Sequence, residues 1–211
     1  MPTKPIEIKQ TRLILAEGAD AYYFMIWAYQ AYGRTDIQVL DFGGIDDLRR
    51  FLSTLRLTDN FESVETILIA RDAETDPRAA IASVRDTLLQ AGLARPETPF
   101  SFTDTIPKVG FVLFPGFEDR EGTRTYLNGT LEDLCLSTVA SDPLMPCVDT
   151  YLDCASNAGE DMRHRHKSRL HTYLSGKHGH AGKRLSEAAR HGAFDWEHPR
   201  LLPFKQAIIE M

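Results

Sequence analysis

Two short apolar runs in this chain each end abruptly in acidic residues. The run 13–16 leads directly into Glu17, and the run 67–70 leads, after a single arginine, into Asp72 and Glu74. Short aliphatic runs of this kind are typical of central parallel strands, and ligands of an open α/β sheet bind beside the carboxyl ends of its strands. We therefore expect these three carboxylates to lie at one edge of a sheet.

Carboxylates that converge in this way repel one another and need a compensating cation. Their hard oxygen atoms favour magnesium, manganese or calcium over zinc. Asp20, three residues after Glu17, is a further candidate ligand. The alternative is structural, because acidic residues that follow a strand often cap the next helix. The pattern predicts a divalent-metal site, and helix capping remains open for either cluster alone.

The order of apolar patterns along the chain predicts an α/β fold with a mainly parallel central sheet flanked by helices. Right-handed crossovers should connect its strands. A basic, helical C-terminal extension over 136–211 should pack on an α/β domain over 1–135. We expect strands at 7–16, 37–40, 66–70 and 109–114, a turn at 41–44, a polar loop at 115–124, and helices at 19–31, 45–55, 77–91, 130–139, 146–156, 163–174 and 181–191.

Composition points to one principal globular domain. The chain has 211 residues, of which 43% are hydrophobic, and that is enough for a substantial core. No apolar stretch approaches the roughly 20 residues that cross a bilayer, and Met1–Glu7 lacks the features of a signal peptide, so we expect a cytoplasmic protein. Cys135, Cys147 and Cys154 show no CxxC pairing and are expected to be buried, reduced core residues.

Charge is divided unevenly along the chain. Residues 1–162 carry 14 Lys or Arg against 26 Asp or Glu, whereas residues 163–211 carry 10 against 4. The segment 163–186 contains no acidic residue and includes Arg163, Lys167 and Lys177. Such a segment can contact phosphates, or it can form a solvated basic helix face packed on an acidic body. Both interpretations remain open.

The acidic motifs resemble those of the Toprim domain, the small α/β module of topoisomerases, primases and overcoming-lysogenization-defect nucleases. In that family a Glu, usually within an EG turn, follows the first strand, and Asp-x-Asp follows a later one. Here Glu17-Gly18 and Asp72-Ala73-Glu74 take those places. The resemblance spans about residues 7–135, and it is closest to small uncharacterised Toprim-like proteins. Ala21 stands where the nucleases often add an acid.

The resemblance implies a metal-dependent nuclease that binds nucleic acid. Asp72 and Glu74 would hold Mg²⁺ or Mn²⁺, and Glu17 would act as a general acid or base. Lys167 or Lys177 would neutralise the scissile phosphate. Further metal-ligand candidates are Asp20, Glu132 and Asp133, and candidates for binding phosphate are Gly18, Gly43, Gly44, Arg163 and Lys177. No GxxxxGK[ST] motif occurs, so an ATPase partner would be a separate protein.

Two alternatives come from other functional classes. The first is a Toprim-fold module without catalysis that binds a nucleotide, nucleic acid or partner protein. The second is a different α/β hydrolase that acts on a small phosphorylated substrate in a closed pocket. The aromatic residues around Trp27 are expected to lie in a helix core or at a homodimer surface.

Overall fold

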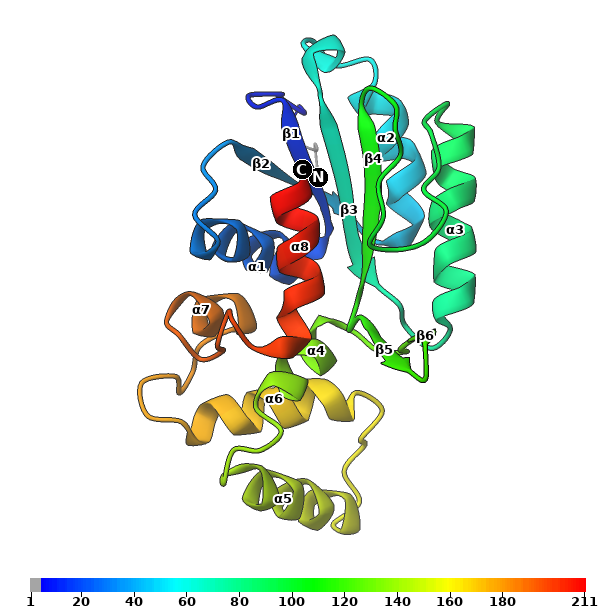
Figure 1. Cartoon of the computed structure of the whole chain (residues 1–211). Helices are drawn as coiled ribbons and strands as arrows, with labels where there is room; N and C mark the ends of the chain where they lie inside the picture. Colours follow the sequence, from blue (N-terminus) through cyan, green and yellow to red (C-terminus); the bar gives the residue numbers. More distant parts are fainter. Residues whose placement is uncertain (1–4) are drawn as a thin grey trace.

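A parallel sheet of four strands forms the centre of the molecule. The computed structural model describes residues 5–211, apart from the side chain of Ile45. The strands are β1 (Arg12–Glu17), β2 (Ile37–Gly43), β3 (Thr66–Asp72) and β4 (Lys108–Phe114), in the spatial order β2-β1-β3-β4 (Figure 1). The predicted parallel α/β fold is therefore confirmed. The expectation for Met1–Glu7 falls partly outside the described range.

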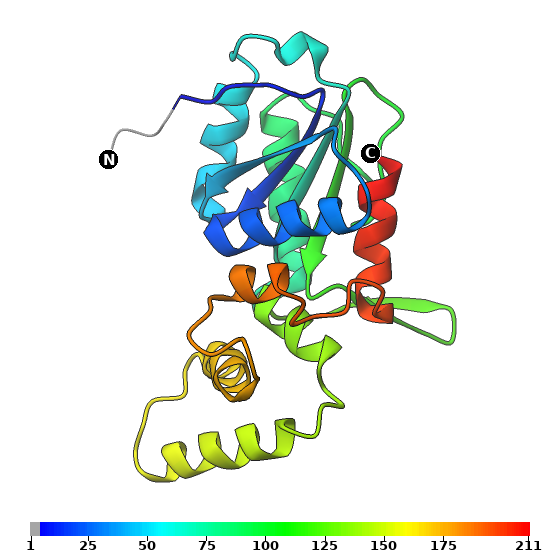
Figure 2. The same cartoon turned by 90° about the vertical axis from the view of Figure 1, so that its left-hand side faces the viewer.

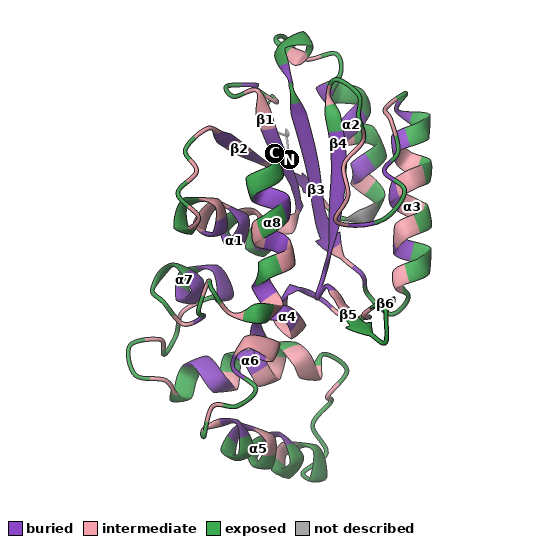
Figure 3. Ribbon diagram, viewed as in Figure 1, coloured by how far each residue is buried: buried purple, intermediate pink, exposed green. Residues whose placement is uncertain are grey.

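The strands alternate their side chains between two apolar layers, as the pleat of a β-strand requires. Ile14, Leu68 and Val112 belong to one core cluster, whereas Leu13 and Ile67 belong to the other. All five of these side chains are at most 1% exposed. Figure 3 shows the strands as the most continuously buried part of the chain. Near-continuous aliphatic strands form here because both faces of the sheet are covered.

Helices from both ends of the chain cover the first face. Helix α1 (Gly18–Ala31) packs there beside α8 (Leu202–Glu210), the last helix of the chain (Figure 2). The other face is covered by α2 (Leu48–Leu55), preceded by the short 3-10 turn η1 (Ile45–Asp47), and by α3 (Pro77–Gln90). A second 3-10 turn, η2 (Phe61–Ser63), precedes β3.

The remaining helices lie beyond the carboxyl ends of the strands (Figure 1). They are α4 (Leu131–Thr138), α5 (Met145–Asn157), α6 (Arg165–Gly176) and α7 (Leu185–Arg190), and the 3-10 turn η3 (Pro199–Leu201) leads into α8. Helix α7 contacts α1, and α6 contacts both α4 and α5. None of the helices in the described part of the chain is both long enough and apolar enough to span a membrane.

Several expected boundaries were wrong. Strand β1 begins at Arg12 rather than residue 7, and β2 continues through most of the expected turn at 41–44. The expected loop 115–124 contains most of an antiparallel hairpin, β5 (Phe117–Arg120) with β6 (Thr123–Tyr126). The hairpin was missed because its strands are only four residues long and mostly polar. Part of its packing is also tertiary: Phe117 packs edge-to-face on Phe100, with ring centroids 5.1 Å apart.

The C-terminal part of the chain also differs from expectation. The predicted helix 181–191 is shortened to Leu185–Arg190, because Gly182 adopts a left-handed φ of 77° before the helix begins. Helix α8 was not predicted at all. It returns to the sheet, where the Met211 carbonyl accepts hydrogen bonds from Arg12 Nε (2.7 Å) and Thr66 Oγ1 (3.1 Å). The end of the extension thus completes the core of the α/β domain.

The cysteine prediction was correct for one residue of three. Cys135 is buried in the core, whereas Cys147 and Cys154 are exposed on α5, and all three are free thiols. Helix α5 lies at the periphery of the helical part and contacts α6, so only one side of it is covered. The two cysteines occupy its uncovered side.

Candidate active site at the carboxyl edge of the sheet

Glu17 and Asp72 are the last residues of two adjacent parallel strands, β1 and β3. From β1 the chain moves outward to β2 on one side, and it then crosses to β3 on the other side. The point between β1 and β3 is therefore the topological switch point of the sheet. Helices on opposite faces leave a crevice at such a point, and α/β proteins bind ligands there.

The two acidic residues are in direct contact through the backbone. The Asp72 amide donates to Glu17 Oε2 at 3.4 Å, and Asp72 Oδ1 accepts from the Leu131 amide at 2.9 Å. The second contact ties the end of β3 to the first residue of α4. Both carboxylates are thus positioned by regular elements rather than by loops.

Arg71 is a charged residue of the site that sequence reasoning missed. Its side chain is buried, its Nε lies 3.6 Å from Glu17 Oε2, and the same Nε donates to the Asp72 carbonyl at 3.2 Å. A buried guanidinium needs carboxylate partners to offset its lost hydration. The available signal was the presence of one cation inside an otherwise apolar strand.

Burial dominates the electrostatics of the acidic pair. It raises the pKa of Asp72 to about 7, helped by the nearby charges of Glu17, Glu132 and Glu74 and opposed by the Leu131 amide. Burial also raises the pKa of Glu17, and it outweighs the opposing effect of Arg71. With a pKa of about 7, Asp72 can hold or release a proton near neutral pH, as general acid–base catalysis requires, and burial shifts the pKa of Glu17 in the same direction.

Glu74 lies at the rim of the site. Its backbone adopts a left-handed φ of 55° and forms a bridge with Gly129, in which each amide donates to the other residue's carbonyl at 2.9 and 2.7 Å. The Glu74 side chain is exposed. Within residues 5–211, no three His, Cys, Asp or Glu side chains are grouped as ligands of one metal ion. The expected triad of Glu17, Asp72 and Glu74 is therefore not assembled at ligand distance.

Helix packing brings Glu132 and Lys167 to the same edge. Lys167 Nζ on α6 lies 3.8 Å from Glu132 Oε1 on α4, and Glu132 is close enough to Asp72 to raise its pKa. The structure thus places Lys167, the expected phosphate-neutralising residue, beside the acidic residues. Asp133 has another role. Its Oδ2 accepts from the Thr130 amide (2.9 Å) and hydroxyl (3.1 Å), so it stabilises the start of α4.

The glycines expected to bind phosphate have amides that are already bonded to carboxylates. Asp41 Oδ1 accepts from the amides of Gly18 (3.1 Å) and Gly43 (2.8 Å), and the Gly44 amide donates to Asp47 at 3.3 Å. Asp41 thereby joins the start of α1 to the end of β2. These contacts leave the three amides without a free hydrogen for a phosphate, and they favour a structural role.

The other candidates are distributed around the helical part. Arg163 pairs with Asp161 at 2.5 Å, and Lys177 pairs with Asp142 at 2.7 Å in a separate pocket that Tyr173 also lines. Neither cation is directed to the acidic pair. These two cations thus behave as the solvated helix-face charges of the alternative interpretation.

Asp20 lies in the first turn of α1, where Ser186 Oγ donates to its Oδ1 at 3.4 Å. This contact ties the start of α1 to α7. Burial raises the pKa of the Cys135 thiol, and the charges of Glu132 and Asp20 raise it further. Both acids therefore lie near the same buried sulfur atom.

The fold and site define the class of protein: a doubly wound parallel α/β protein with acidic residues at its switch point. Over residues 11–210 the chain matches the model of DUF3226, a family described as a protein of unknown function, and it belongs to that family. The match spans both the sheet and the C-terminal helices. No curated protein and no solved structure matches the chain.

Proposed function

We propose that this protein is a metal-dependent phosphoryl-transfer enzyme of Toprim type, namely a nuclease that cleaves phosphodiester bonds. The observation that carries the proposal is the contact between Glu17 and Asp72 at the switch point of the sheet. Lys167 supports it, because a cation beside carboxylates can neutralise a phosphate that approaches them.

The donor chemistry fits Mg²⁺ or Mn²⁺ through two carboxylates rather than three. Magnesium keeps several water ligands and commonly uses only one or two protein carboxylates together with substrate phosphates. Asp72 has one oxygen bonded to the Leu131 amide, which leaves its second oxygen for a cation. Glu17 has one oxygen bonded to the Asp72 amide, which leaves its second oxygen for the cation or for a proton. A bound ion would stabilise charge on the phosphoryl oxygens.

The chain's own residues supply the remaining functions. Glu17, whose pKa is raised by burial, exchanges a proton with the attacking water or the leaving oxygen. Arg71 holds the Glu17 carboxylate in place from within the sheet. Lys167 binds the phosphate from α6, and its pairing with Glu132 across 3.8 Å is loose enough to be exchanged for a stronger phosphate contact.

A second candidate is a module of the same fold that binds nucleotide, nucleic acid or a protein without catalysis. One observation favours it: over residues 5–211 no three potential ligands are grouped for a metal ion. A binding module needs the crevice but not the assembled metal centre.

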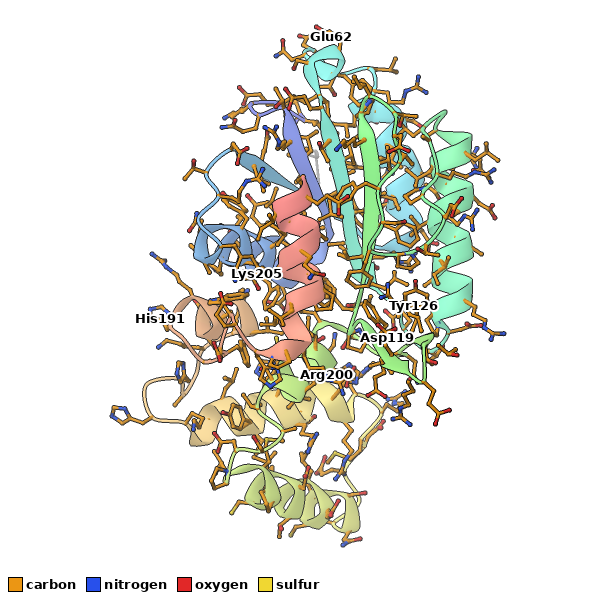
Figure 4. All side chains as sticks on the ribbon, viewed as in Figure 1. Glu62, Asp119, Tyr126, His191, Arg200 and Lys205 are labelled. Carbon is orange, nitrogen blue, oxygen red and sulfur yellow. The ribbon has the colours of Figure 1, made fainter. Side chains whose placement is uncertain are left out.

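The test is cleavage of supercoiled plasmid and of single-stranded DNA by the purified protein in Mg²⁺ or Mn²⁺. Glu17→Gln and Asp72→Asn should abolish nicking. Glu62→Gln is the matched control, because Glu62 is an exposed acidic residue in η2, which precedes β3 and so lies at the end of that strand opposite to Asp72 (Figure 4). Cleavage lost in both site variants and retained in the control would support the enzyme. A folded wild type that never cleaves would favour the binding module.

A further inference from the structure

A pocket of about 740 Å³ lies between α1 and α7, next to the candidate active site. Helix α1 contributes two aromatic side chains, and the segment around α7 contributes basic ones; the residues that matter are Tyr23, Trp27, Lys183, Arg184, Arg190 and His191. Figure 4 labels His191, which lies on the α7 side of the molecule. The volume is within the range of typical small-ligand sites.

The cations of this pocket differ from the other cations of the C-terminal region. Seven of the ten Lys and Arg residues after position 162 form ion pairs, namely Arg163, Arg165, Lys167, Arg169, Lys177, Arg200 and Lys205. Among the described residues, Lys183, Arg184 and Arg190 have no carboxylate partner within 4 Å, and all three line this one pocket. Two carboxylates, Asp20 and Glu187, also line the pocket, so its cations exceed its anions by one. An excess of positive charge around a cavity favours an anionic ligand.

The aromatic side of the pocket has a surface on which bases can stack. Tyr23 is 47% exposed, and the Arg190 guanidinium carbon lies 4.7 Å from the centroid of the Trp27 ring. Aromatic rings and guanidinium planes both stack with nucleobases, so a base can stack on Trp27 by displacing the Arg190 guanidinium that covers the ring in this structure. A lipid or a simple phosphate would use the cations but would leave the tryptophan and tyrosine rings without a function.

Asp20, at the start of α1, lies between the pocket and the acidic edge of the sheet along the chain. This residue lines the pocket and follows Glu17 by three positions, and Ser186 of α7 donates to its carboxylate. A chain bound along the pocket would therefore run toward the Glu17–Asp72 pair. The flexible backbone of a single strand suits this path, because unstacked bases can turn toward Trp27 while the phosphates face the cations.

We propose that the α1–α7 pocket binds a short segment of single-stranded nucleic acid, with a base stacked on Trp27 and phosphates bound by Lys183 and Arg184. The inference rests on the proposed function and deepens it, because it names single strands as the substrate class. Duplex nucleic acid, whose bases remain stacked within the helix, cannot use Trp27 in this way.

The experiment measures binding of a fluorescein-labelled dT12 oligonucleotide by anisotropy, with EDTA present so that no cleavage occurs. Trp27→Ala should weaken binding about 5- to 150-fold, the range expected for the loss of one stacked base. Lys183→Ala should lower the slope of log affinity against log salt by about 0.7, the value for one phosphate contact on a single strand. A duplex of the same length should bind more weakly than dT12.

Arg165→Ala is the matched control, because Arg165 is a cation of the same region that is paired with Asp153 outside the pocket. The affinity of Arg165→Ala for dT12 should stay within about twofold of that of the wild type. Saturable binding that Trp27→Ala and Lys183→Ala weaken, and Arg165→Ala does not, would establish the site. The proposal would be overturned if dT12 did not bind, or if all three variants bound it as tightly as the wild type. Circular dichroism checks that each variant is folded.

The readout also separates this inference from the proposed function. Binding at Trp27 without cleavage in Mg²⁺ would refute the nuclease and leave the strand-binding site intact. Cleavage that continues while Trp27→Ala binds dT12 as tightly as the wild type would refute the strand-binding site alone.

Discussion

Replacing Asp72 by Asn should stabilise the metal-free protein at pH 8 while abolishing the proposed nuclease activity. Burial and three neighbouring carboxylates raise the pKa of Asp72 from 3.8 to about 7, so its ionised form is disfavoured in the folded state. Asn has nearly the same shape, and its side-chain oxygen can still accept from the Leu131 amide. The substitution therefore removes a buried charge and keeps the structural hydrogen bond.

The magnitude follows from the linkage between pKa and stability. The pKa of Asp72 is higher in the folded protein than in the unfolded chain, so between these two values the folded wild type keeps a proton that the unfolded chain releases. The stability of the wild type therefore falls as the pH rises from about 4 to about 7. A shift of about three pH units at about 1.4 kcal/mol each gives an upper limit of about 4 kcal/mol. Because Asp72 is only half-buried at the sheet edge, water reduces this to about 2 kcal/mol.

The assay is thermal unfolding of wild type, Asp72→Asn and Glu62→Gln in EDTA between pH 4 and pH 8. For a chain of this size, about 2 kcal/mol corresponds to a gain of about 4–8 °C for Asp72→Asn at pH 8. The gain should vanish near pH 4, and Glu62→Gln should show no comparable trend. Saturating Mg²⁺ should then raise the melting temperature of the wild type but not of Asp72→Asn, since a ligand stabilises only the state that binds it.

Two results would refute this reasoning. If Asp72→Asn melts below the wild type at pH 8 in EDTA, the charge of Asp72 is already compensated inside the protein. If Mg²⁺ stabilises both proteins equally, Asp72 does not contribute to a metal site.

Two further predictions concern the buried arginine and the thiols. Arg71→Met should destabilise the protein by about 3 kcal/mol, because it leaves Glu17 without its cation. Adding Glu17→Gln should recover part of this loss. If the unfolding free energies of the two substitutions, measured in urea, were strictly additive, the pairing of Arg71 with Glu17 would be contradicted. Cys147 and Cys154 should react with a thiol reagent in the native protein, whereas Cys135 should react only after unfolding. Three reactive thiols in the native protein would contradict the burial of Cys135.

The fold class and the relative position of the two main acidic residues followed from local patterns. Strands buried on both sides must be nearly continuously apolar, so the runs 13–16 and 67–70 can be recognised as central strands from the sequence. Parallel strands place their carboxyl ends at one edge, so the expected approach of Glu17 and Asp72 needed only the order of strands and helices. The local signals were reliable because each depends on residues that are close in sequence.

The tertiary structure decided which of the candidate groups remain available for chemistry. The ion pair of Lys177 and the hydrogen bonds of Asp41 to Gly18 and Gly43 join distant segments, and they removed candidates that the sequence favoured. The docking of α8 on the sheet and the gathering of unpaired cations at α7 have the same origin. A charged side chain is neutralised or left free by the partners that folding brings to it, and those partners lie too far along the chain for any local pattern to reveal them.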